Sequence, residues 1–178
     1  MKKIILIVLF FAIIFNTFSQ NCGIYYSATD YKNSNFSEQG SKIFVNLVFK
    51  PNYVKLKTND NTIYFNKDSI WGVKIENSIF RFSNSVKYEL VENEGLLIYK
   101  TFVQAKMRKD RIKYFFSQNP DSEILPLTVE NIENSFSSNT KFIDLLHVSV
   151  INDENLYDFD KNCNNLRITN LYNLSNRQ

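Results

Sequence analysis

The sequence predicts an α+β protein, mainly antiparallel β, in which a meander of about seven to nine strands precedes short C-terminal helices. Two observations predict the sheet. Short apolar runs alternate with turn-forming residues from Ile43 to Phe116, and several runs alternate apolar with polar side chains, as strands with one wet face do. A third predicts the helices: from about residue 128 the apolar residues recur three or four positions apart.

The apolar runs give the strands in order. They are Ile43–Phe49, Tyr53–Thr58, Thr62–Phe65, Ile70–Ile75, Ile79–Phe82, Val86–Val91, Leu96–Val103 and Ile112–Phe116. Turn-forming residues such as Pro51-Asn52 and Asn93-Glu94-Gly95 stand between them. Because these connections are short, consecutive strands should pair as hairpins. A curved open sheet and a barrel-like sheet both fit this pattern.

Side chains that cap helices mark four predicted helical starts near the C-terminus. They are Thr128, Asn139, Asp153 and Asn162. After the first of these, Ile132 and Phe136 lie four residues apart and so share one helical face. The predicted helices therefore present an apolar face to the sheet.

Residues 1–19 have the pattern of a secretory signal peptide. Two lysines precede the apolar stretch Ile4–Phe15, whose 12 residues are fewer than the roughly 20 that a membrane-spanning helix needs. Thr17 and Ser19 are small residues at the positions that signal peptidase selects. We expect cleavage after Ser19.

The remaining residues, 20–178, are expected to form a single β-rich domain with a helical part from about residue 128. Removing Lys2 and Lys3 lowers the formal net charge from +3 to +1. No later stretch is long and apolar enough to predict a transmembrane segment. The predicted location is periplasmic or extracellular, with association to the envelope left open.

Cys22 and Cys163 are the only cysteines, and an oxidising compartment favours a disulfide between them. With two Cys and one His, the chain lacks the ligands of a zinc-finger array or a cysteine-held iron–sulfur cluster. The stretch 158–162 imitates the start of a calcium loop, but Cys163 and Thr169 replace the required Gly and Glu. No metal or other cofactor is predicted.

A basic cluster is expected at the tip of a hairpin. It consists of Lys106, Arg108, Lys109, Arg111 and Lys113. Such a cluster could contact the phosphate groups of an envelope lipid or an acidic partner. The alternative is a structural role, in which the charges lie on a solvated turn and prevent the sheet edge from pairing with another chain. Nucleic acid is not an expected partner, because the chain is predicted to leave the cytoplasm.

Catalytic residues are not identifiable from the pattern. His147 follows Asp144 on a predicted helix, but no Gly-x-Ser-x-Gly nucleophile elbow accompanies them, so a surface histidine is expected. A hydrolase that uses two carboxylates stays open as the least favoured alternative. Its unranked candidates are Asp68, Glu76 and Glu123.

Aromatic residues are abundant, with 16 Phe, 10 Tyr and one Trp in the chain. Trp71 precedes Gly72 within a predicted strand, where a glycine lets a bulky neighbour or a bend fit. A well-filled core is the simplest explanation of these residues. The alternative is a barrel whose aromatic interior carries a small apolar or lipid-like ligand.

Several short motifs resemble one group of proteins. They are Gly23-Ile24-Tyr25, Asp30-Tyr31, Ile70-Trp71-Gly72, Leu127-Thr128 with Asn131, and Asn139 before Lys141-Phe142, behind a leader that ends Phe18-Ser19-Gln20. Together they resemble uncharacterised small exported proteins of Bacteroidota. The resemblance implies an envelope or secreted location and transfers no site residues.

The sequence as a whole favours a non-enzymatic exported module that binds a partner in the envelope or has a structural role there. The partner would be an envelope protein. A barrel-type carrier of a small apolar ligand is the first alternative, and an extracellular hydrolase the second. Fold class alone does not decide among them.

Overall fold

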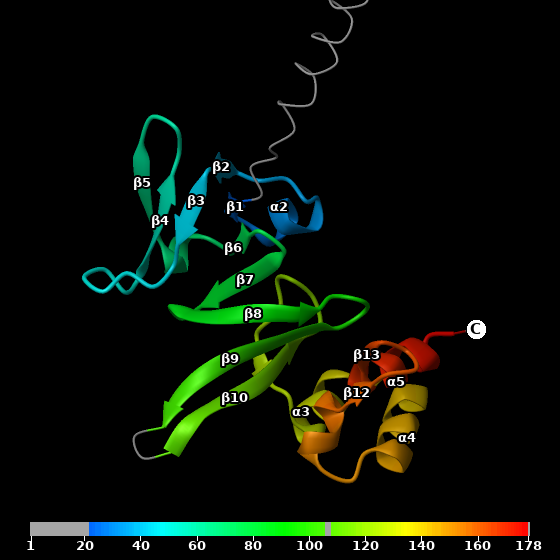
Figure 1. The fold of residues 1–178 in the computed structure, drawn as a ribbon. Helices are drawn as coiled ribbons and strands as arrows, with labels where there is room; N and C mark the ends of the chain where they lie inside the picture. Colours follow the sequence, from blue (N-terminus) through cyan, green and yellow to red (C-terminus); the bar gives the residue numbers. More distant parts are fainter. Residues whose placement is uncertain (1–21, 106–107, 178) are drawn as a thin grey trace, which may run out of the picture.

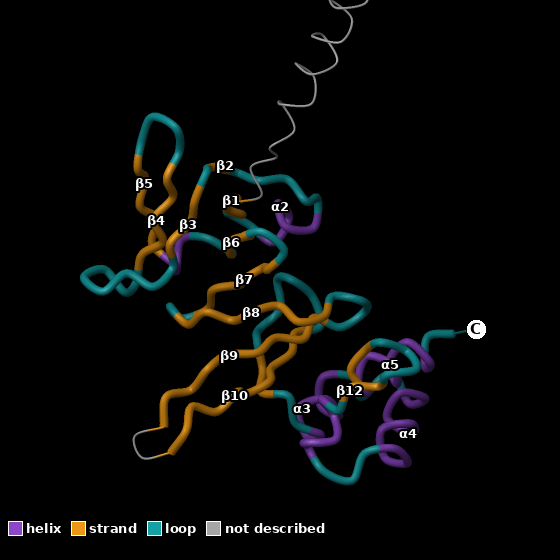
Figure 2. Tube along the Cα trace, viewed as in Figure 1, coloured by secondary structure: helices purple, strands orange, loops and turns teal. Residues whose placement is uncertain are grey.

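The computed structural model describes residues 22–105 and 108–177, with only the backbone described at residues 104, 105 and 108–111. The predicted signal peptide lies outside these residues. The described chain is an α+β fold built mainly from antiparallel strands, as predicted (Figure 1). The helices gather beside one end of the large sheet, apart from a short one near the N-terminus (Figure 2).

The largest element is an eight-stranded antiparallel sheet. Its strands, in spatial order, are β11 (Leu125–Pro126), β10 (Arg108–Ser117), β9 (Leu97–Ala105), β8 (Val86–Glu92), β7 (Ser78–Ser83), β6 (Gly72–Ile75), β1 (Cys22–Tyr25) and β2 (Glu38–Gly40). The run from β6 to β10 corresponds to the last five strands of the predicted meander, whereas β11, β1 and β2 were not predicted. Neither end strand pairs with the other, so the sheet is open and the barrel-like alternative is wrong.

A second, three-stranded sheet contains β3 (Lys42–Phe44), β4 (Tyr53–Lys57) and β5 (Thr62–Asn66). It was not expected as a separate sheet, because short turns had suggested one continuous meander. The predicted strand Ile43–Phe49 is also too long, since pairing stops at Phe44 and residues 45–52 form a loop. The 3₁₀ turn η1 (Lys67–Ser69) leads from β5 towards β6.

The C-terminal part is helical, as predicted. It contains α3 (Val129–Ser135), α4 (Thr140–Ser149), the 3₁₀ turn η2 (Asp153–Tyr157), the small hairpin of β12 (Phe159–Asp160) and β13 (Asn165–Leu166), and α5 (Arg167–Ser175). Thr128 and Asn139 cap α3 and α4 as expected. Asn152 rather than Asp153 caps η2, and Asn162 lies in the turn before β13 instead of capping a helix.

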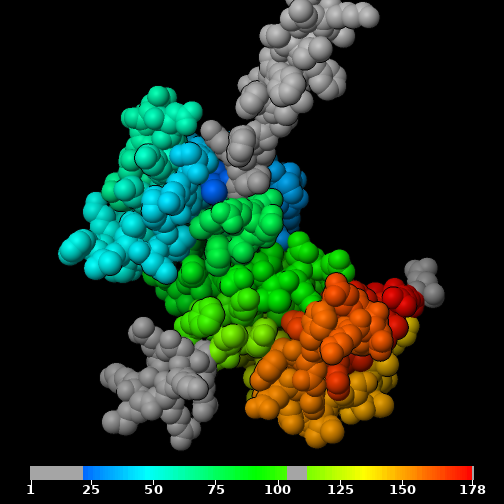
Figure 3. All heavy atoms as spheres, viewed as in Figure 1, coloured from blue at the N-terminus to red at the C-terminus, as the bar shows by residue number. Residues whose placement is uncertain are grey.

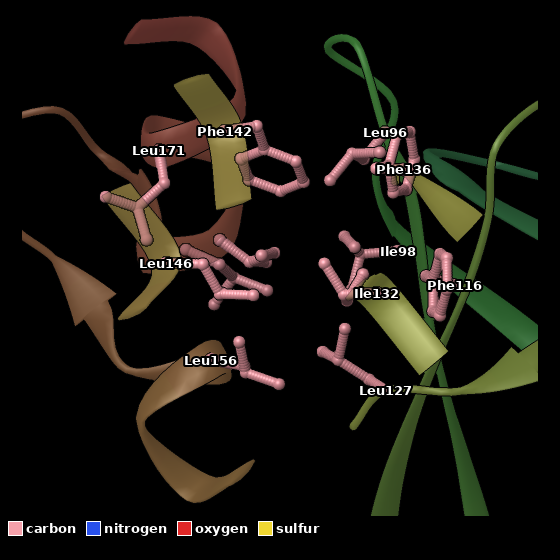
Figure 4. Packing of buried hydrophobic residues seen from close by; sticks show 12 residues of the cluster. Leu96, Ile98, Phe116, Leu127, Ile132, Phe136, Phe142, Leu146, Leu156 and Leu171 are labelled. Atoms are coloured by element: carbon pink, nitrogen blue, oxygen red, sulfur yellow. The ribbon is translucent and has the colours of Figure 1, made fainter. Parts of the chain in front are cut away.

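Two apolar cores lie at opposite ends of the large sheet. The first packs Ile98 and Phe116 of β9 and β10 against helix residues such as Ile132, Phe142 and Leu146 (Figure 4). The second lies between the small sheet and the β1–β6–β7 end of the large one. Its members include Ile24, Ile43, Val54, Leu56, Val73 and Phe82. The small sheet is therefore held in place by one apolar face.

A polar cluster centred on Arg81 lies between these cores. The buried guanidinium donates to the Tyr99 hydroxyl at 3.1 Å, the Ser117 hydroxyl at 3.2 Å and the Ser122 carbonyl at 2.7 Å. Trp71 is buried nearby and donates through Nε1 to the Pro120 carbonyl at 2.7 Å. These bonds fix the loop after β10 across the sheet, and they place Trp71 in a filled core rather than in a ligand cavity.

Gly72 shows why a glycine follows Trp71. A Cβ atom at this position would lie 2.2 Å from the Phe80 carbonyl oxygen on the neighbouring strand. No side chain fits at that distance, so β6 and β7 can approach each other only with glycine here.

Candidate functional site

The outward face of the small sheet has an unusual composition. Strand alternation directs Val54 and Leu56 of β4 into the core, and so it directs Tyr53, Lys55 and Lys57 outwards. We call the outward lysines and aromatic residues of this sheet, together with Lys50 of the adjoining loop, the lysine–aromatic face. Its members are Lys42, Phe44, Lys50, Tyr53, Lys55, Lys57 and Tyr64.

Strand register arranges these residues in rows. Phe44 pairs with Lys55, and Lys55 pairs with Tyr64, which gives an aromatic–lysine–aromatic row across the three strands. In the next row Lys42 pairs with Lys57, so two like charges are directly opposite. Such a pair is unfavourable for sheet stability. The Lys42–Lys57 pair therefore does not contribute favourably to the stability of the sheet.

The aromatic rings position the ammonium groups. The Nζ atoms of Lys42 and Lys55 lie 5.0 and 5.3 Å from the centre of the Phe44 ring. Lys50 Nζ lies 4.4 Å from the Tyr64 ring centre and 5.9 Å from that of Tyr53. These are cation–π distances, at which a ring attracts a positive charge without neutralising it.

The charge of this face is one-sided. Between Lys42 and Lys67 the only acidic residue is Asp60, which lies in the turn between β4 and β5. Lysines on the face are thus not interleaved with carboxylates of their own sheet. Clustered charges of one sign create a local potential that attracts and orients oppositely charged partners.

The loop after β3 adds an apolar tip, which we define as the half-buried Leu47 and the exposed Val48 and Phe49. Val48 is 88% and Phe49 96% exposed, and the loop projects from the small sheet (Figure 3). A hollow of about 400 Å³ separates the tip from the face and is lined on the sheet side by Lys55 and Tyr64. The tip and the face therefore border one recess.

A second recess, the lysine groove, adjoins the first at Asn46 and has a volume of about 350 Å³. Its lining residues are Asn46, Lys67, Val86, Lys87, Glu89, Lys100, Thr101 and Phe102. Lys100 pairs with Glu89 at 3.2 Å. Lys67 is buried and donates from Nζ to the Pro51 carbonyl at 2.6 Å. Burial, and then repulsion from Lys87, lowers the pKa of Lys67 below 10.5.

The predicted disulfide is wrong. Cys22 is buried in β1, within the core beneath the small sheet, whereas Cys163 is exposed in the turn between β12 and β13. These elements lie in different parts of the molecule (Figure 1). Both cysteines are free.

The predicted basic cluster begins between β9 and β10 in the sequence and continues into β10, where Arg111 and Lys113 pair with Val103 and Thr101 of β9. Lys106 lies outside the described residues, as do the side chains of Arg108, Lys109 and Arg111, whose backbone belongs to β10. Lys113 is exposed on β10. The cluster is therefore not part of the lysine–aromatic face.

The sequence candidates for catalysis do not assemble into one site. His147 is exposed on α4 and its Nε2 lies 2.6 Å from Glu133 Oε1 on α3, so it forms a surface contact between helices. The Asp68 carboxylate accepts hydrogen bonds from the backbone and hydroxyl of Ser85, at 2.7 and 2.8 Å. Glu76 lies in the turn between β6 and β7, and Glu123 is exposed after β10.

The acidic stretch 158–162 serves local structure. Asp158 pairs with Arg167 at 3.4 Å, and Asp160 accepts from the Asn162 backbone at 2.9 Å. Within the described residues there is no group of three or more His, Cys, Asp or Glu suited to holding a metal.

Sequence reasoning missed the lysine–aromatic face, although part of its signal was visible. The alternation of Val54 and Leu56 with Lys55 and Lys57 shows that two lysines face outwards. It does not show that register brings Phe44 and Tyr64 to either side of Lys55. Nor does it show that Val48 and Phe49 leave the strand.

Comparison with protein-family models, curated proteins and solved structures finds no match to this chain. The helices within residues 22–105 and 108–177 are too short or too polar to cross a bilayer.

Proposed function

We propose that the protein is a non-enzymatic exported binding module that attaches to an anionic partner in the cell envelope through the lysine–aromatic face. The single observation that carries the proposal is the face itself. It presents three lysines and three aromatic residues, including a like-charged cross-strand pair, on a sheet whose other side is a packed core, and Lys50 of the adjoining loop adds a fourth lysine.

The export step of this proposal rests on the signal pattern of residues 1–19 and on the resemblance to exported proteins. Physical chemistry supports the anionic partner. A cluster of like charges costs stability when the protein is alone, and a partner of opposite charge offsets that cost. The residues that would bind are Lys42, Lys50, Lys55 and Lys57.

The barrel-type carrier loses its structural basis, because the large sheet is open and both of its ends are covered by packed side chains. The hydrolase alternative gains no support from its candidate Asp68, whose two carboxylate oxygens both accept hydrogen bonds from Ser85.

A matched pair of variants tests the proposal. The mature chain and the variant Lys55→Gln/Lys57→Gln would be immobilised and exposed to envelope extracts of the native cell. The control, Lys141→Gln/Lys161→Gln, removes the same charge from exposed positions in the helical part. We expect the parent and the control to enrich the same component and the face variant to lose it. Equal enrichment by all three would contradict the proposal.

A further inference from the structure

We propose that the anionic partner is the surface of a phospholipid bilayer containing anionic lipid, and that the apolar tip inserts into it while the lysine–aromatic face contacts lipid phosphates. This inference rests on the proposed function and names the partner of the same site. It is carried by three observations: the exposure of the tip, the placement of the ammonium groups, and a second exposed apolar pair beside the lysine groove.

The apolar tip has the properties of a membrane-inserting loop. Val48 and Phe49 are consecutive, nearly fully exposed, and followed by Lys50. Surface binding to membranes combines burial of such apolar side chains at the boundary between headgroups and acyl chains with attraction between basic residues and anionic lipids. The tip supplies the first contribution and the adjacent face the second.

The ammonium positions favour phosphate over a ligand that stacks. Lys42 and Lys55 lie over the Phe44 ring, and Lys50 lies over that of Tyr64. A base or a sugar ring that stacks on these rings would have to displace the lysines. A phosphate group needs only the exposed side of each ammonium. The face is thus arranged to present charge rather than bare rings.

A second exposed apolar pair extends the docking surface. Phe102 of β9 and Ile112 of β10 are paired in register, and both are exposed. Phe102 and Asn46 line the same lysine groove, so this pair lies across the groove from the loop that carries the apolar tip. Figure 1 shows that loop and the β9–β10 hairpin extending from the same side of the molecule. A flat surface could therefore meet both.

Vesicle sedimentation tests the inference directly. The mature protein would be mixed with vesicles of pure phosphatidylglycerol or of pure phosphatidylcholine. We expect binding to phosphatidylglycerol only, and weaker binding as salt is added, because salt screens exposed charges. Losing one lysine near an anionic surface should lower the partition coefficient roughly fivefold, so Lys55→Gln/Lys57→Gln should lower it roughly 25-fold.

The tip has its own matched control. Val48→Ser/Phe49→Ser should lower binding to phosphatidylglycerol roughly tenfold or more, because two apolar side chains no longer leave water. Val148→Ser/Ile151→Ser changes an equally exposed apolar pair at the end of α4 and should leave binding unchanged. All four positions are exposed, and circular dichroism would confirm that each variant is folded.

Binding to dextran sulfate, a soluble polyanion, distinguishes failure of the membrane inference from failure of the proposed function. Binding to dextran sulfate that depends on Lys55 and Lys57, without binding to either vesicle, would overturn the membrane inference and leave the proposed function standing. Binding to neither would overturn both. Undiminished vesicle binding by Val48→Ser/Phe49→Ser would overturn insertion of the tip.

Discussion

Asp30 illustrates how a single carboxylate organises the N-terminal end. It accepts hydrogen bonds from the Ser27 backbone and the Ser37 hydroxyl, both at 2.9 Å, and Ser27 in turn caps the short helix α2 (Ala28–Lys32). The bonds from Ser27 and Ser37 lower the pKa of Asp30 below 3.8, because they stabilise the charged form.

This pKa shift predicts how stability depends on pH. A depressed pKa in the folded state means that the stabilisation from Asp30 is fully present above the ordinary value of 3.8 and is lost as pH falls through the folded value. Asp30→Asn should therefore lower the melting temperature at pH 7, and the difference from the parent should shrink below pH 3.8. Thermal unfolding over a pH series measures it.

The control is Asp60→Asn, which alters an exposed carboxylate in the turn between β4 and β5. It should change the melting temperature less at pH 7. A gap between parent and Asp30→Asn that widens on acidification would contradict the assigned role of Asp30.

At the scale of elements, the like-charged residues on the outer face of the small sheet lower the free energy of unfolding. Replacing Lys57 by Glu turns the Lys42–Lys57 pair from repulsive to attractive. We expect Lys57→Glu to raise the free energy of unfolding by about 0.5 kcal/mol at low salt while weakening anion binding. Lys57→Gln should fall between the parent and Lys57→Glu in both properties.

Urea denaturation and vesicle sedimentation on the same samples would check this prediction. If Lys57→Glu were less stable than the parent, the Lys42–Lys57 pair would not destabilise the small sheet, contrary to the prediction from the strand register. If it were more stable and bound equally well, Lys57 would have no part in binding.

The last helix depends on a residue far away in the sequence. Leu166 is the N-cap of α5 and offers no capping side chain. Instead, the Glu92 carboxylate of β8 accepts from the Leu166 backbone at 2.5 Å and from the Thr169 hydroxyl. A register shift between Leu90 and Glu92 accompanies this contact, as is common where a strand redirects a side chain.

Removing this cap should have a measurable cost. We expect Glu92→Ala to lower the free energy of unfolding by about 1–2 kcal/mol, since the first turn of α5 would lose its acceptor. Glu94→Ala, at an exposed position nearby, should cost less than about 0.5 kcal/mol. Chemical denaturation compares the two, and equal losses would show that Glu92 does not act as a cap.

These elements also show what the sequence could predict. Short apolar runs between turns identified β3 to β10, and Thr128 and Asn139 marked the starts of α3 and α4, because both signals act within a few residues. The short strands β1, β2, β11, β12 and β13 were not predicted. The α5 cap was out of reach, since Glu92 precedes Leu166 by 74 residues. The run from Val45 to Phe49 resembled a strand, yet Val45 is its only buried member.

At the scale of the whole molecule, the fold places two cores at the ends of one open sheet and leaves the small sheet's outer side free. The sequence predicted an α+β fold, but not that β3–β5 would separate or that β1 would pair with β6 across the chain. Such pairings depend on which apolar faces pack together in the folded chain, and local sequence patterns do not specify this. The candidate site depends on them too, because register builds its rows.

We propose that the lysine–aromatic face, rather than another surface, contacts the envelope. The most direct test is photo-crosslinking in the native cell, with a photoreactive residue in place of Tyr64 on the face or of Ile151 beyond α4. Both side chains are exposed. We expect crosslinks to envelope components from position 64 and few or none from position 151. Crosslinks from position 151 alone would contradict it.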